Sequence, residues 1–141
     1  MRRLVLDTSV VTTAFRSRHG ASRVVLDGVA DGVFVPLMTP ALFLQYEDVL
    51  KRPEQLKASR LTLRRVDQIL AALASAAEPV SVHYSWRPQL PDPGDELVFE
   101  AAVNGRADVL VTYNERHFAA AAARFGLRIA RPADVLREII S

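Results

Sequence analysis

Residues 4–10 read LVLDTSV, a short apolar run that ends in an aspartate and two hydroxyl side chains. A continuous apolar run is typical of a parallel strand, because helices cover both of its faces. Thr8 and Ser9 can cap a helix that continues through Phe15. The stretch therefore predicts a buried strand that leads into a helix, with Asp7 at the junction.

The same alternation continues along the chain. Further strands are predicted at 33–37, 80–82, 109–112 and 127–130, and helices at 22–29, 40–51, 59–77, 95–104, 115–125 and from 132 onward. This order predicts an α/β fold, a three-layer α/β/α sandwich with a central parallel sheet, as a single domain over residues 1–141. Right-handed crossovers bring all carboxyl ends of the strands to one edge, where such sheets hold their active crevice.

Composition narrows the class of protein. The chain has no cysteine, a net charge of +2 and a pI near 9.4, and it has no apolar run long enough to span a membrane. Disulfides and thiolate metal sites are excluded, and we expect a cytoplasmic protein without a membrane partner. The mildly basic charge permits a nucleic-acid partner without requiring one.

Polar side chains gather at the predicted carboxyl edge. They are Asp7 with Thr8, Asp92 with Asp95 and Glu96, and Thr112 with Asn114 and Glu115. Converging carboxylates repel each other unless a cation neutralises them, and hard oxygen ligands favour Mg²⁺ or Mn²⁺. Such a cluster suits metal-assisted hydrolysis of a phosphodiester.

Each acid also has a simpler interpretation. Asp7 could have no role beyond capping the next helix, and Asp95 could have no role beyond stabilising the dipole of its helix. On a helical wheel, however, Asp95 shares the small apolar face, whereas Glu96 points the other way and is expected in solvent. Asp92, beside proline, is typical of a turn.

The chain resembles the PIN-domain family, in the branch identified as toxin components of bacterial toxin–antitoxin pairs. The motifs that carry the resemblance are LVLDTSV at 4–10, TPALFLQYEDVL at 39–50, DPGDE at 92–96, ADVLVT at 107–112 and RPADVL at 131–136. It implies a PIN fold, an endoribonuclease that needs Mg²⁺ or Mn²⁺, an RNA substrate, inhibition by a small antitoxin protein, and a homodimer.

The resemblance also assigns residues. It places the family's acids at Asp7 and Asp95, which are then the metal ligands, and at two positions where this chain has Gln45 and Asn114. His117 stands where this branch often has a further aspartate. The helical wheel leaves Gln45 and Glu47 equally able to reach the crevice. Thr8, Asp92, Glu96, Thr112, Glu47 and His117 remain possible auxiliary residues.

Because Gln45, Asn114 and His117 carry no negative charge when neutral, a second hypothesis is a catalytically weakened PIN module that binds RNA or a protein without cutting. A third is a receiver-like phosphoacceptor domain, which needs a late lysine. Both lysines, Lys51 and Lys57, lie mid-chain, which counts against it. Trp86 could stack on a base or anchor a loop.

Overall fold

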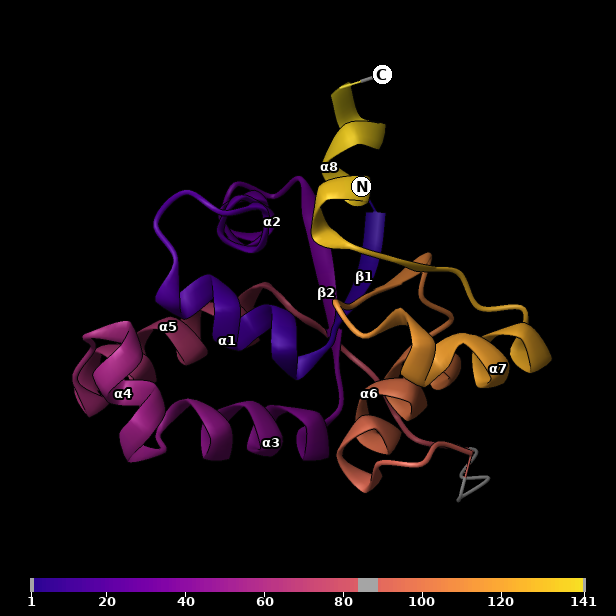
Figure 1. Ribbon diagram of the computed structural model, residues 1–141, viewed down its shortest axis with the longest axis horizontal. Helices are drawn as coiled ribbons and strands as arrows, with labels where there is room; N and C mark the ends of the chain where they lie inside the picture. The colour runs from indigo at the N-terminus through magenta and orange to yellow at the C-terminus, as the bar shows by residue number, and fades with distance from the viewer. Residues whose placement is uncertain (1, 84–88, 141) are drawn as a thin grey trace.

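A computed structural model of the chain describes residues 2–83 and 89–140 (Figure 1). Within these residues, parallel strands form one sheet in the order β3-β2-β1-β4-β5. The strands are β1 (Arg2–Leu6), β2 (Phe34–Met38), β3 (Glu78–Pro79), β4 (Val109–Val111) and β5 (Ile129–Ala130). Trp86, for which base stacking or loop anchoring was predicted, lies outside the described residues.

Helices cover both faces of this sheet. They are α1 (Thr8–Arg16), α2 (Ala21–Ala30), α3 (Pro40–Leu50), α4 (Pro53–Ser59), α5 (Leu63–Ala76), α6 (Pro93–Asn104), α7 (Glu115–Phe125) and α8 (Pro132–Ile140). Helix α6 packs against β1, β2 and β4, while α2 packs against α1, α8 and β2. In Figure 1, α1, α4 and α5 lie to one side of the strands and α6 and α7 to the other. The predicted three-layer α/β/α fold is confirmed.

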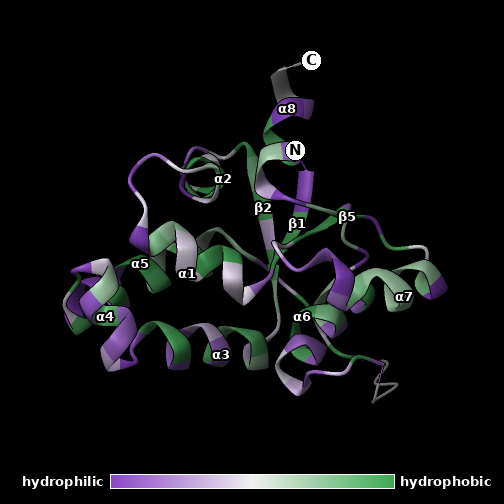
Figure 2. Cartoon of the chain, in the orientation of Figure 1, coloured by the Kyte–Doolittle hydropathy of each residue, from purple (hydrophilic) through white to green (hydrophobic). Residues whose placement is uncertain are grey.

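The core follows from the apolar strands. Leu4 and Val5 of β1 and all three residues of β4 have no exposed surface. Figure 2 shows hydrophobic residues concentrated along the central strands and hydrophilic residues prominent on the outlying α4. Within the described residues, no helix combines the length and the hydrophobicity needed to cross a membrane.

Several predicted element boundaries were wrong. Pro53 does not only end α3 but also opens the unpredicted α4, because proline fits the first turn of a helix as well as it ends one. Helix α5 begins at Leu63 rather than near 59, with the Thr62 side chain accepting a hydrogen bond from the Arg65 N–H at 3.1 Å. The third strand lies at Glu78–Pro79, just before the predicted 80–82.

The predicted starts of three helices were also wrong. Helix α1 begins at Thr8 with Asp7 at its N-cap position, so neither Thr8 nor Ser9 is its cap. Helix α2 begins at Ala21 after Gly20, and Ser22 lies inside it, where its hydroxyl hydrogen-bonds Tyr113. Helix α6 begins at Pro93, so Asp95 lies in its first turn instead of opening it. The true cap is Asp92, whose carboxylate accepts the Gly94 N–H at 2.9 Å. Asp95 therefore has no capping duty to explain its position.

Candidate active site at the carboxyl edge of the sheet

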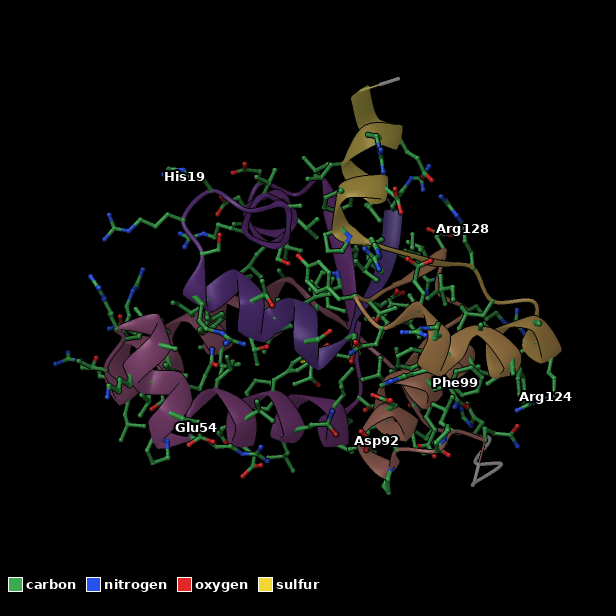
Figure 3. All side chains as sticks on the ribbon, viewed as in Figure 1. His19, Glu54, Asp92, Phe99, Arg124 and Arg128 are labelled. Atoms are coloured by element: carbon green, nitrogen blue, oxygen red, sulfur yellow. The ribbon has the colours of Figure 1, made fainter. Side chains whose placement is uncertain are left out.

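The strand order reverses direction between β1 and β4, the place where parallel sheets generally bind ligands. From β1 the chain builds outward to β2 and β3, and then returns to add β4 and β5 on the other side. Connections on the two sides of such a reversal diverge, which leaves a crevice beyond the carboxyl ends of the strands. Asp7 and Thr112 follow these two neighbouring strands, and the Asp7 N–H donates to the Val111 carbonyl at 2.9 Å. Figure 3 shows Asp92 at the start of α6, below the same ends.

Asp7 is buried just beyond the end of β1 and is held by hydroxyl groups. It is 3% exposed, and its Oδ2 accepts hydrogen bonds from Thr112 Oγ1 at 2.6 Å and from Ser9 Oγ at 3.0 Å. Although Asp7 stands at the N-cap position of α1, its side chain makes no capping hydrogen bond. Capping therefore does not account for this carboxylate, which is instead oriented by two side-chain donors.

Thr112 connects the ends of the two strands. Its side chain is fully buried, and its hydroxyl donates to Asp7 while accepting the Asn114 N–H at 2.9 Å. A single hydroxyl thus fixes both the carboxylate and the turn that leads into α7. Asn114 itself is exposed at the start of α7 and makes no side-chain capping bond.

Asp95 carries the clearest sign of a missing partner. It is 8% exposed, and within the described residues its buried Oδ2 has no hydrogen-bond partner. His117 Nδ1 lies 3.4 Å away, too long for a good hydrogen bond, and pairs with Asp95 as an ion only when protonated. Burial, then the charges of Asp7 and Asp92, raise the pKa of Asp95, and His117 opposes them. The site therefore holds uncompensated negative charge.

Helix α3 turns Gln45, not Glu47, toward this site. The Gln45 Nε2 donates to Thr8 Oγ1 at 2.7 Å, directly beside Asp7. Glu47 instead pairs with Lys51 at 3.2 Å, and Lys51 also pairs with Asp67 on α5 at 2.6 Å. The ambiguity that the helical wheel left between the two residues is resolved by their neighbours.

Tyr46, which was not among the predicted site residues, sets the position of α3. Its side chain is 1% exposed, and its hydroxyl donates to the carbonyl of Leu6, the last residue of β1. Burial and the negative charge of Asp7 raise its pKa, so the phenol stays protonated. Its place in the TPALFLQYEDVL helix next to Gln45 was the available signal, but apolar spacing alone marked it as core.

Glu96 is not solvated, contrary to the expectation from the wheel. It is 4% exposed, and its Oε1 accepts the backbone N–H groups of Gln89 at 2.6 Å and Leu90 at 2.8 Å. Glu100, on the same face, is also buried. The wheel describes only the helix, whereas the segment before α6 folds back over this face and supplies N–H donors that need an acceptor. Glu96 thus anchors a loop.

The remaining candidate acid is also engaged elsewhere. Glu115 Oε1 accepts a hydrogen bond from Arg131 Nε at 2.9 Å, so this acid is already paired with a cation. Among the residues that the structure describes, no three His, Asp or Glu side chains are grouped so as to hold a metal ion. Two buried carboxylates, one of them with an unpartnered oxygen, nevertheless suit a hard divalent cation, with neutral oxygen atoms beside them.

An α/β/α fold with two buried carboxylates at its switch point defines the class of this protein. The sequence model of the PIN domain family matches residues 3–116, so the chain belongs to that family. The fold is also similar to the crystal structure of VapBC2 from Rickettsia felis bound to a DNA fragment from their promoter. The TM-score is 0.57 at 16% identity, over 92% of this chain and 98% of that one. A search of curated proteins finds no match.

Proposed function

We propose that this protein is a divalent-metal-dependent endoribonuclease and acts as the toxin of a toxin–antitoxin pair. Proteins of the PIN domain family are generally metal-dependent nucleases, and the family match covers Asp7, Asp95 and Asn114. The observation that carries the proposal is the buried Asp95 oxygen without a partner beside the buried Asp7 carboxylate. Two like charges held together at such a crevice are costly, and a bound cation offsets that cost.

In this proposal Asp7 and Asp95 hold Mg²⁺ or Mn²⁺. When bound, the metal lowers the pKa of water and stabilises charge on the phosphate. Thr112 and Ser9 orient the Asp7 carboxylate through their hydroxyl groups. The side chains of Gln45 and Asn114 offer neutral oxygen atoms at the edge of the site, in positions where the family resemblance implies acids.

The partners follow from the same reasoning. The substrate is RNA, and the regulator is a small antitoxin protein in the cytoplasm, with the toxin as a homodimer. The similarity in fold to VapBC2, which was crystallised bound to a DNA fragment from its promoter, supports the antitoxin partner alone.

A second candidate function is a PIN module that binds RNA or a protein without cutting. It is favoured by the neutral Gln45 and Asn114 and by the lack, among the described residues, of a third metal-ligating acid in the group. The two candidates share a fold and differ in whether two carboxylates suffice for catalysis.

The deciding experiment measures cleavage of a defined single-stranded RNA by the purified protein. Cleavage with Mg²⁺ or Mn²⁺ that stops with EDTA and is lost in Asp7→Asn supports the nuclease. No cleavage by the natural protein, with activity gained in Gln45→Glu, supports the binding module. Cleavage that survives both EDTA and Asp7→Asn refutes the metal mechanism.

A further inference from the structure

A hollow of about 750 Å³ lies at the end of α1 that is remote from Asp7. Its walls come from the end of α1, the following turn, α2, the turn between α4 and α5, and the first half of α5. In Figure 3, nitrogen-tipped side chains gather around this part of the molecule, beside the loop that carries His19 and beside α4. Nothing in the proposed catalytic site uses these groups.

The charge of this hollow differs from that of the molecule. Five arginines line it: Arg16, Arg18, Arg23, Arg60 and Arg65. Among the described residues, Asp27 is its single acidic lining residue, so the lining carries +4. The whole chain carries only +2, and the rest of the protein is therefore net negative. A local excess of this size attracts polyanions that the remainder of the surface repels.

Most of these arginines are not committed to acidic side chains. Among the described contacts, only Arg23 forms an ion pair with the lining acid. Its Nε lies 3.2 Å from Asp27 Oδ1. Arg16 donates from Nε to the Thr12 carbonyl at 3.4 Å, and Arg65 donates to the Gln68 side chain at 3.2 Å. These are neutral acceptors, so the positive charge of both guanidinium groups stays available to a ligand.

The backbone of Arg60 adopts a conformation that is unfavourable for a residue with a side chain. It ends α4 in the left-handed conformation, with φ 61°, where glycine is the usual residue. Ser59 holds this turn, because its hydroxyl donates to the Leu56 carbonyl and accepts the Leu61 N–H. A long cation held in a strained conformation at the mouth of a hollow suggests that its side chain has a use.

Apolar side chains form the floor between these cations. They are Phe15, Leu26, Leu61 and Ile69, which are buried or half-buried. Arginines around an apolar floor suit a ligand that alternates phosphates with flat, weakly polar rings, because the guanidinium groups bind phosphate and the floor accepts the ring faces. Single-stranded RNA has this alternation.

Helix α1 connects the hollow to the catalytic crevice. It begins at Thr8, next to Asp7, and ends at Arg16 on the rim, which is about 13 Å for nine residues. The Gln55 side chain of α4 donates to the Thr12 carbonyl at 3.1 Å and fixes the far wall to this helix. A few nucleotides of one strand can therefore lie along α1 from one site to the other.

We infer that this arginine-lined hollow binds the phosphates of the RNA strand away from the cleaved bond. The inference rests on the proposed nuclease function and adds to it a subsite that selects longer RNA. The hollow contributes affinity through contacts to phosphate, which carry no sequence information.

The test measures binding of a fluorescein-labelled uridine dodecamer by anisotropy, in EDTA so that no cleavage occurs. Arg65→Ala should weaken binding about 3-fold and lower the salt slope by about 0.7, the value for one lost phosphate contact on a single strand. Arg64→Ala is the matched control: Arg64 is the exposed neighbour on α5, outside the hollow, and should have less than half that effect.

Arg60→Gly separates binding from folding. Glycine suits the left-handed backbone, so the melting temperature should stay equal or rise, while RNA binding falls about 3-fold.

The outcomes distinguish this inference from the proposed function. Equal loss of dodecamer binding in Arg64→Ala and Arg65→Ala, or no loss in either, overturns the subsite and leaves catalysis at Asp7 untouched. If Arg65→Ala weakens dodecamer binding more than Arg64→Ala does, but the protein never cuts RNA, the subsite is supported and the nuclease proposal fails. Arg65-dependent binding of polyglutamate with unchanged RNA binding would assign the hollow to an acidic protein segment and overturn the inference.

Discussion

Charged side chains are paired at the amino edge of the sheet, whereas at its carboxyl edge a buried carboxylate oxygen lacks a hydrogen-bond partner among the described residues. At the amino edge, Arg3 donates from its guanidinium to Glu78 and to the carbonyls of Gly105 and Arg106, at 2.8 to 2.9 Å. Its backbone N–H donates to Asp108 at 2.8 Å. Cation and anions are paired, and the arginine ties β1 to the turn after α6.

At the carboxyl edge, two carboxylates converge and no cationic side chain other than a protonated His117 lies against Asp95 among the described contacts. Asp95 keeps one buried oxygen without a hydrogen bond. A folded protein rarely leaves such a group unsatisfied unless a ligand completes it. A cluster of charged side chains alone therefore does not mark a functional site, whereas a cluster in which a buried group lacks a hydrogen-bond partner does.

The largest expected effect comes from removing the charge at the centre of the unsatisfied edge. Asp7→Asn should lower RNA cleavage at least about 100-fold, since losing even an outer partner of a metal ligand costs about 10- to 100-fold. Cleavage kinetics with Mn²⁺ measure this, and circular dichroism checks that the fold persists. Undiminished cleavage in a folded Asp7→Asn protein would remove Asp7 from the site.

The next effect concerns the hydroxyl that orients Asp7. Thr112→Val keeps the shape of a fully buried side chain but loses both hydrogen bonds, so cleavage should fall about 10- to 100-fold and stability by about 1–2 kcal/mol. The control is Thr13→Val, which loses a comparable hydroxyl bond, to the Ser9 carbonyl, without touching a carboxylate. Equal losses of activity in both variants would contradict an orienting role.

Adding an acid should sharpen the contrast between the edges. Gln45→Glu places a third carboxylate beside Thr8 and should raise Mn²⁺ affinity about 10-fold, because hard-cation sites strengthen with ligand charge. Isothermal titration measures the affinity. Glu47→Gln, which removes an acid paired with Lys51, should leave it unchanged. An effect of Glu47→Gln as large as that of Gln45→Glu would mean that α3 is turned the other way.

Relieving the repulsion should stabilise the metal-free protein. Since burial and Asp7 raise the pKa of Asp95, its charged form opposes folding, and Asp95→Asn should raise the melting temperature in EDTA by about 3 °C. The gain is fully present above the raised pKa and disappears below the ordinary value of 3.8. Added Mn²⁺ should stabilise the natural protein and not the variant. A lower melting temperature for Asp95→Asn in EDTA would show that the carboxylate is already compensated.

The smallest effect on cleavage is expected at the satisfied edge. Arg3→Met removes a partly exposed ion pair and two hydrogen bonds to backbone carbonyls, so stability should fall by about 1–2 kcal/mol, whereas cleavage should not change. Chemical denaturation and the same cleavage assay measure the two quantities. A loss of activity comparable to that of Thr112→Val would break the contrast between the edges.

The fold was predictable because its signals are local. An apolar run followed by Asp7, and the regular alternation after it, depend only on neighbouring residues, and they predicted the layers and the parallel sheet. The missed α4 shows the limit of local signals, because Pro53 fits both the end of one helix and the start of the next.

The site required the tertiary structure. Sequence and resemblance together singled out Asp7, Asp95 and Gln45, but the helical wheel alone left Gln45 and Glu47 undecided, and only their partners in the fold, Thr8 and Lys51, separate the two. Glu96 became buried because a loop folded over it and brought N–H donors.

The α/β architecture and the residues at the ends of its strands thus follow from the amino-acid sequence alone, since periodicity and turn chemistry act over a few positions. Which charges are compensated became known only from the folded arrangement. The partners of a charged group include side chains that are distant in sequence, as Thr112 is from Asp7. In the same way, Arg16, Arg60 and Arg65 come from distant positions to line one hollow. Electrostatic energy depends on distance and burial in space, and neither quantity can be read along the chain.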